Sequence, residues 1–370
     1  MTVDRESMKS LIKNLSLFLC VFTNAVAAET LYIGSGLRNG DGGIYSCRFA
    51  DGKLTKPRRL VSLPSDANLE QSPDGRFLYA SIRSAASGES GELITFQIEK
   101  DGALTEIRRR ASGVEHFCSM AASKNGRQLI GASYNDGVVS SFQLKAGETE
   151  RTASRIELPR FPKGRKKLAR AHDVEFSTDG KHAFVPDIFN NRIYVFDVDP
   201  KSGALKQSHF VTSDSFQGPR HLILDAGGNT LYLLNQTGSS VVVFRHDGKG
   251  GLKELQAIST LPAGYNGRQN HSAEVLLHPN GKTLYISNRI HDSLVAFRIG
   301  KDGHLTKIQT ISSGGESPWS FVITKDGRHL ICSNRKSNNV LVFSINDSSG
   351  QLKQLPGEIK VPEPVSLSLR

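Results

Sequence analysis

Short runs in which apolar and polar residues alternate recur along the chain from about residue 30 onward. In six of them the alternation surrounds an aromatic residue, namely Phe96, Phe142, Phe196, Phe244, Phe297 and Phe343. A period of two, in segments rich in β-branched and aromatic residues, is typical of strands with one buried face. No comparable helical periodicity follows residue 30, so the pattern predicts an all-β protein.

A turn motif precedes each of these strands and repeats with them. Its copies end at Gly75, Gly126, Gly180, Gly228, Gly281 and Gly327. Most of these glycines follow Asp or Asn, and such pairs between strand-like runs are hairpin signals. The copies are spaced by roughly 50 residues, which is the size of a four-stranded propeller blade. Each copy therefore predicts one blade.

The two ends of the chain predict how the ring of blades closes. Residues 31–34, 43–49 and 58–63 have the pattern of a second, third and fourth strand, without a first. Residues 364–369 at the C-terminus supply the missing alternation. We expect a seven-bladed β-propeller in which this strand completes the N-terminal blade, because closure removes exposed strand edges. No linker interrupts the repeats, so we expect residues 28–370 to form one domain.

The first residues have the pattern of a secretory signal. Arg5, Lys9 and Lys13 precede an apolar stretch, and a small-residue cleavage site ends at Ala27. We therefore expect a signal peptide over residues 1–27 and an exported protein, periplasmic or secreted. No apolar run reaches the ~18 residues that a spanning helix needs, so no integral membrane segment is expected in the mature chain.

Composition narrows the class of protein further. The chain has 370 residues, of which 38% are hydrophobic and 22% charged, and this excludes collagen-like and largely disordered proteins. Four cysteines are too few for a disulfide scaffold. The formal net charge of +11 favours anionic partners, but export and the lack of a recognition motif argue against nucleic acid. The sequence has no metal-binding, Walker or dinucleotide motif, so we expect no metal and no cofactor.

The propeller geometry predicts where polar residues of different blades meet. The first strand of a blade lines the channel and the second runs antiparallel to it, so the start of one and the end of the other share a mouth. Candidate residues at first-strand starts are His172, Arg220, Glu274 and Trp319. Candidates at second-strand ends are Asp187, Asn235, Gln236, Asn288, Arg289 and Arg335. Arginine and histidine gathered at one opening suit a carboxylate, phosphate or polyhydroxy ligand.

Several features near this mouth have more than one interpretation. Arg220 and Arg289 either face the ligand or close the ring through ion pairs between blades. His221 follows Arg220, so in a regular strand it faces the opposite side and has a structural role. Trp319 either stacks on a sugar ring or packs between blades. The basic segment 160–170 is a solvated loop, a lid that attracts an anionic substrate, or a docking patch for a polyanion.

Two motifs connect the chain to a known family. GPRH at residues 218–221 is followed one blade later by SNR at residues 287–289, within blade segments of similar pattern. Together these segments resemble the seven-bladed propeller lactonase family, which includes bacterial 6-phosphogluconolactonases and fungal carboxy-muconate cyclases. The resemblance covers roughly residues 30–370 and implies the propeller fold.

The resemblance also implies an active site. The family's channel histidine corresponds to His172, its two arginines to Arg220 and Arg289, and its acidic residue to Gln236. A glutamine can hydrogen-bond but cannot exchange a proton near neutral pH. Ser119 stands where the family has a further histidine. We expect His172 to act as the base, with Arg220 and Arg289 stabilising the oxyanion. The alternative is that His172 is a structural histidine bonded to a neighbouring blade.

We therefore expect a lactonase-type hydrolase of carbohydrate metabolism, similar to 6-phosphogluconolactonase, that opens a sugar or related lactone at one mouth of the channel. The expected substrate-binding residues are Asp187, Asn235, Gln236, Glu274, Asn288 and Trp319. Glu274 is alternatively a base or a salt-bridge partner. Two other functions stay open: a catalytically silent propeller that binds an anionic sugar, peptide or envelope ligand, and a muconate-type cycloisomerase. The expected partner is a small-molecule lactone or acidic sugar, and we expect a monomer.

Overall fold

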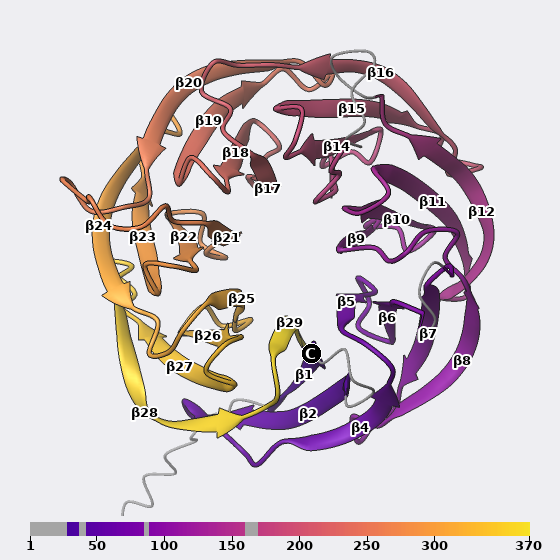
Figure 1. The fold of residues 1–370 in the computed structure, drawn as a ribbon, viewed down its shortest axis with the longest axis horizontal. Helices are drawn as coiled ribbons and strands as arrows, with labels where there is room; N and C mark the ends of the chain where they lie inside the picture. Colours follow the sequence, from indigo (N-terminus) through magenta and orange to yellow (C-terminus); the bar gives the residue numbers. More distant parts are fainter. Residues whose placement is uncertain (1–27, 37–41, 85–88, 160–168) are drawn as a thin grey trace, which may run out of the picture.

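Seven antiparallel sheets stand around a central axis as the blades of a propeller (Figure 1). The computed structural model describes residues 28–36, 42–84, 89–159 and 169–370. The expected signal peptide, residues 1–27, and most of the basic segment 160–170 lie outside these ranges. Among the residues described, no helix is long and apolar enough to cross a membrane.

Each blade has four main strands, ordered from the channel outward. The channel strands are β29 (Pro364–Leu369), β5 (Ala67–Gln71), β9 (Ser119–Ala122), β13 (Glu175–Phe176), β17 (Pro219–Leu224), β21 (Ser272–Leu277) and β25 (Pro318–Ile323). The second strands are β1 (Glu29–Ser35), β6 (Phe77–Ile82), β10 (Gln128–Ser133), β14 (His182–Asp187), β18 (Thr230–Asn235), β22 (Thr283–Asn288) and β26 (His329–Asn334).

The two outer strands of each blade follow in the chain. The third strands are β2 (Gly42–Ala50), β7 (Glu92–Ile98), β11 (Val138–Lys145), β15 (Arg192–Val198), β19 (Ser240–His246), β23 (Ser293–Ile299) and β27 (Asn339–Ile345). The outermost are β4 (Arg58–Leu63), β8 (Leu104–Ala111), β12 (Glu148–Glu157), β16 (Leu205–Val211), β20 (Leu252–Ser259), β24 (Leu305–Ser312) and β28 (Leu352–Lys360), while the short β3 (Lys53–Leu54) pairs with β2.

The ring closes through the two ends of the chain. The C-terminal strand β29 pairs antiparallel with β1, with Leu31 opposite Leu369 and Ile33 opposite Leu367. Figure 1 shows β29, in yellow, on the channel side of the indigo strand β1. The seven-bladed, all-β fold and the closure by residues 364–369 are therefore confirmed.

The hydrophobic core lies mostly between neighbouring blades. The six phenylalanines of the alternating runs are all fully buried. One cluster, for example, joins Tyr232 and Val243 of one blade to Leu284 and Phe297 of the next. Burial of such a side chain contributes about 1.5–3 kcal/mol, so the packing of blade on blade holds the channel strands at fixed positions around the axis.

The turns between first and second strands depend on their glycines. All six turn glycines have φ between 66° and 72°, a left-handed conformation that glycine adopts without a steric cost. In the first of these turns Ser72 donates to Asp74 and accepts the N–H of Phe77. The repeated motif thus reverses the chain at the same place in each blade.

Candidate active site

A cavity of about 580 Å³ lies on the axis of the ring and is lined by side chains from all seven blades. Its lining includes His172, Arg220, Gln236, Glu274, Arg289 and Trp319. These residues come from four consecutive blades that span more than a hundred positions of the chain. The propeller geometry therefore brings together the histidine and both arginines on which the predicted chemistry depends.

Irregular pairing at the start of three channel strands directs side chains into this cavity. In β17, Arg220 is an extra residue between Pro219, which pairs with Asn235, and His221, which pairs with Leu234. The same register shift occurs near the start of β21 and of β25. A β-bulge bends a strand and changes where its side chains point. As a result, Arg220 and His221 both line the cavity, and the expectation that His221 faces away from it is wrong.

Arg220 is fixed by three hydrogen bonds. Its Nε donates to the backbone carbonyl of Ala273 at 2.9 Å, and one terminal nitrogen donates to Oε1 of Gln236 at 2.8 Å. The same nitrogen contacts Nε2 of His172. Only 3% of Arg220 is exposed, so a buried guanidinium is held in one orientation by neutral partners. A cation held in this way is suited to stabilising negative charge in the cavity.

The contact with Arg220 determines the state of His172. A guanidinium has only donors, so Nε2 of His172 accepts and its proton lies on Nδ1. Burial first, and then the charge of Arg220, lower the pKa of His172 well below its ordinary value. No described residue forms a hydrogen bond with the buried Nδ1. This geometry makes His172 a neutral residue that positions Arg220, and it leaves no free lone pair with which His172 would act as a base.

Three arginines surround the indole of Trp319. The guanidinium carbons of Arg289, Arg335 and Arg220 lie 4.5, 4.7 and 5.7 Å from the ring centroid. Arg335 forms an ion pair with Glu363 at 2.8 Å. Burial, together with the charges of Arg220 and Arg335, lowers the pKa of Arg289. One terminal nitrogen of Arg289 is buried and has no hydrogen-bond partner among the described residues. The cluster therefore carries positive charge that an anion would neutralise.

Comparison with known proteins identifies the family. The family model for lactonases of the seven-bladed β-propeller type matches residues 30–369.

The chain belongs to this family.

Among named relatives, the 6-phosphogluconolactonase of Formosa agariphila is 29% identical over 322 residues, covering 83% of this chain and 89% of the relative. The 6-phosphogluconolactonase of Bacillus subtilis is 24% identical over 341 residues, covering 90% and 96%. The solved structure of the periplasmic gluconolactonase of Pseudomonas aeruginosa has 26% identity, a TM-score of 0.85 and coverage of 93% and 99%.

Three predicted binding residues of this lactonase-family propeller lie outside the cavity lining. Asp187, Asn235 and Asn288 each end a second strand, and each is fully buried. Their polar atoms are used in hydrogen bonds with neighbouring turns and loops: Asp187 accepts from Phe189, Asn235 donates to Ser240, and Asn288 accepts from Thr260. In two blades the next residue, Gln236 or Arg289, reaches the cavity instead. Side chains alternate along a strand. The last residue of the strand is therefore buried among the loops, and the residue after it faces the cavity.

Arg335, a candidate at a second-strand end to which no catalytic or binding role was assigned, lines the cavity as well. It ends a second copy of the S-N-R triplet, one blade after the copy that contains Arg289. Repetition of that triplet at the same position in the blade is the sequence signal that identifies it.

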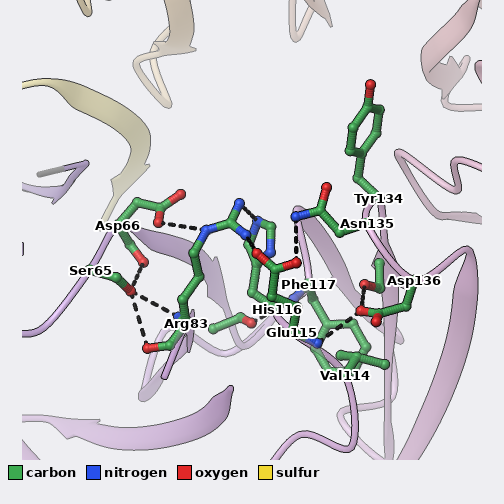
Figure 2. A network of polar contacts seen from close by, with 12 residues as sticks. Ser65, Asp66, Arg83, Val114, Glu115, His116, Phe117, Tyr134, Asn135 and Asp136 are labelled. Carbon is green, nitrogen blue, oxygen red and sulfur yellow. Dashed lines mark hydrogen bonds and ion pairs between the residues drawn. The ribbon is translucent and has the colours of Figure 1, made fainter. Parts of the chain in front are cut away.

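A second polar cluster lines the opposite side of the cavity (Figure 2). Arg83 lies between the carboxylates of Asp66 and Glu115, donating to Asp66 at 3.1 Å. Another nitrogen of Arg83 lies 2.9 Å from Nε2 of His116, and Asn135 donates to Glu115 at 2.7 Å. Here one guanidinium is shared by two carboxylates, in contrast to the arginines around Trp319. This cluster therefore ties two blades together and has more carboxylates than cations, so it does not add to the positive charge of the arginine cluster.

Three carboxyl groups lie deeper among the channel strands. Glu70, Asp173 and Glu175 each accept a backbone N–H from the channel strand of the next blade, at 3.0, 3.0 and 3.5 Å. Burial raises the pKa of all three, to about 8 for Glu70 and Glu175. These groups cover strand edges along the channel. Within the described ranges, no group of three or more His, Cys, Asp or Glu is arranged to hold a metal ion.

Proposed function

We propose that this propeller hydrolyses a sugar lactone or a related lactone in the axial cavity. The observation that supports this best is the meeting of Arg220, Arg289 and Arg335 at Trp319, beside the neutral His172. Both the substrate carbonyl in the transition state and the carboxylate of the product carry negative charge, which these guanidinium groups stabilise. Relatives named 6-phosphogluconolactonase and gluconolactonase support the same reaction class.

Each cavity residue has its own role in the reaction, which follows from the groups that it contacts. Water attacks the lactone carbonyl carbon, and the carbonyl oxygen takes the electron pair of the C=O bond. The unpartnered nitrogen of Arg289 and the remaining donors of Arg220 stabilise this oxyanion, each donor contributing about 10²–10³-fold in rate. The indole of Trp319 provides a flat apolar surface for one face of the ring. His172 keeps Arg220 in place.

A panel of lactones assayed by proton release tests this function. We expect purified protein to open a five- or six-membered sugar lactone, and Arg220→Ala and Arg289→Ala each to lower kcat/KM at least tenfold. Arg298, which is exposed on β23, provides a matched control, so Arg298→Ala keeps the wild-type rate. Equal rates in all four proteins would eliminate the proposal.

Export follows as part of the proposal. The expected signal peptide removes the enzyme from the cytoplasm, where phosphorylated sugars are made, so we propose an unphosphorylated lactone as substrate. A relative of similar fold is named a periplasmic gluconolactonase. Intact mass of the protein recovered from the cell envelope or medium tests this, since cleavage after Ala27 leaves a chain that starts at Ala28. Recovery of the full-length chain in the cytoplasm would contradict export.

One observation favours a second candidate, a propeller that binds an acidic sugar without turning it over. The acid that the family resemblance implies is Gln236, whose amide oxygen accepts from Arg220 and cannot take up a proton. Calorimetry with gluconate, alongside the lactone assay, separates the two functions. Binding of the acid without turnover of any lactone would support the silent propeller, whereas turnover removes it.

A further inference from the structure

A histidine and a glutamate on adjacent channel strands form a pair inside the cavity. Nδ1 of His221, on β17, lies 3.1 Å from Oε1 of Glu274, on β21. Both side chains line the cavity, and 14% and 19% of them remain exposed. The bulge that makes Arg220 an extra residue brings His221 to this position.

The glutamate determines which nitrogen of His221 is available. A carboxylate only accepts, so the proton of His221 lies on Nδ1 and the lone pair on Nε2. The one side-chain hydrogen bond that His221 forms with a described residue uses Nδ1 and leaves Nε2 open. In His172, whose ring centroid is 5.2 Å away, Arg220 occupies the corresponding lone pair. Of these two neighbouring histidines, only His221 has an acceptor nitrogen that a water in the cavity can use.

Glu274 is itself held in place. Its backbone N–H donates to Oγ of Ser287, and its Oε1 also accepts the N–H of Val275, both at 3.1 Å. A carboxylate that orients an imidazole in this way keeps the tautomer fixed and stabilises the imidazolium when it forms. The pair thus has the geometry of a general base with its orienting group, next to the guanidinium groups that stabilise an oxyanion.

We propose that His221 is the general base of the lactone hydrolysis and that Glu274 is the residue that positions it. This inference rests on the proposed function. Nε2 of His221 removes a proton from water as the water oxygen bonds to the carbonyl carbon. Collapse of the oxyanion breaks the ring C–O bond, and the imidazolium returns the proton to the departing ring oxygen. The product is a hydroxy acid, whose carboxyl group then releases a proton to solvent.

The assignment gives Gln236 a consistent role. An amide at that position binds Arg220 without neutralising it, and proton transfer takes place at His221. A chain that lacks the family acid therefore keeps both a cationic oxyanion site and a base.

Kinetic measurements on three variants and one control test the His221–Glu274 dyad. We expect His221→Ala to lower kcat by about 10²–10⁴-fold, with KM within threefold, and imidazole added to the buffer to restore part of the rate. The acidic limb of the kcat–pH profile, which requires a titrating base, should disappear in the variant. Glu274→Gln should lower kcat and Glu274→Asp should recover part of it. His304, paired with Asp302 outside the cavity, is the control, and His304→Ala keeps the wild-type rate.

Each outcome separates the dyad from the proposed function. If wild-type protein opens no lactone, the proposed function fails before the dyad is tested. If wild type is active and His221→Ala retains its kcat and pH profile, the dyad is wrong while the function stands. Gluconate binding and Tm of each variant report on folding. Should His221→Ala fail to fold, His221→Gln takes its place, and a full rate in that variant would also overturn the proposal.

Discussion

Arg220 donates a hydrogen bond to Nε2 of His172, across the boundary between two blades. Both residues are buried, with 3% and 8% of their surface exposed. The bond requires a neutral imidazole, because a protonated His172 would present a second donor to a guanidinium. Arg289 adds further positive potential around the ring. Protonation of His172 would therefore break this contact and disturb the proposed anion site.

This coupling predicts an acid-dependent loss of stability. The folded protein holds the pKa of His172 well below 6.5, whereas the unfolded chain titrates near that value. The stabilising contribution is thus complete above about pH 6.5 and is lost as pH falls, because the unfolded state binds more protons. We expect His172→Gln to lower Tm at pH 7.5 but to differ less from wild type at pH 5. Thermal denaturation between these pH values measures the difference, and parallel curves would contradict it.

Removing a cation from the arginine cluster should increase stability and decrease binding. Arg289 is buried beside Arg220 and Arg335, and burial and these charges disfavour its charged form. We expect Arg289→Met to raise Tm of the free protein and to weaken gluconate binding about 10–100-fold, since a charge-assisted hydrogen bond is lost. Calorimetry and thermal denaturation of the same samples test both parts. Unchanged gluconate affinity, or a lower Tm, would show that Arg289 stabilises the packing of the blades and does not bind a ligand.

The position of the missing family acid offers a third test. In Gln236→Glu the new carboxylate would pair with Arg220, 2.8 Å from the present amide oxygen, and would reduce the positive potential of the site. We expect gluconate affinity to fall about tenfold, equivalent to ~1.4 kcal/mol, and kcat to fall as well, because the oxyanion site loses positive charge while the base remains at His221. Steady-state kinetics with product inhibition measures both. Activation by two orders of magnitude would instead assign the base to position 236.

The fold could be predicted from the sequence because the same pattern of turns and strands is repeated in the blades. Six copies of a turn and six alternating strands around a phenylalanine each predict the same unit, so an error in one copy is corrected by the others. Closure was visible because residues 364–369 carry the alternation that the N-terminal copy lacks, and β29 indeed pairs with β1. Strand ends matched within about two residues, as hydrogen-bonded ladders with buried alternation have a strongly defined register.

The site was less predictable because it lies where the repeat is irregular. Strict alternation directs His221 away from Arg220, but the bulge at the start of β17 directs both into the cavity. At the second-strand ends, composition alone does not distinguish the amide of Asn235 from that of Gln236, yet one is buried in the blade and the other lines the cavity. Both distinctions depend on backbone geometry over one or two residues, which residue types do not specify.

The carboxyl groups of the channel predict the opposite pH trend from His172. Burial raises the pKa of Glu175 from 4.5 to about 8, so the folded protein retains a proton that the unfolded chain releases above about pH 4.5. The resulting stabilisation is complete below that pH and is lost as pH rises towards 8. In Glu175→Gln the amide oxygen can still accept the N–H of Leu224, but the side chain cannot ionise. The variant should therefore match wild type at pH 5 and exceed its Tm by about 2–4 °C at pH 8.

Differential scanning calorimetry at four pH values between 5 and 8 measures the difference in Tm between Glu175→Gln and wild type. Glu150→Gln, on the exposed strand β12, is the matched control and should follow wild type throughout. A constant offset between Glu175→Gln and wild type would mean that Glu175 ionises normally in the folded protein. In that case the channel would be wet enough to solvate its carboxylates, and the strand edges there would be covered by charged acceptors.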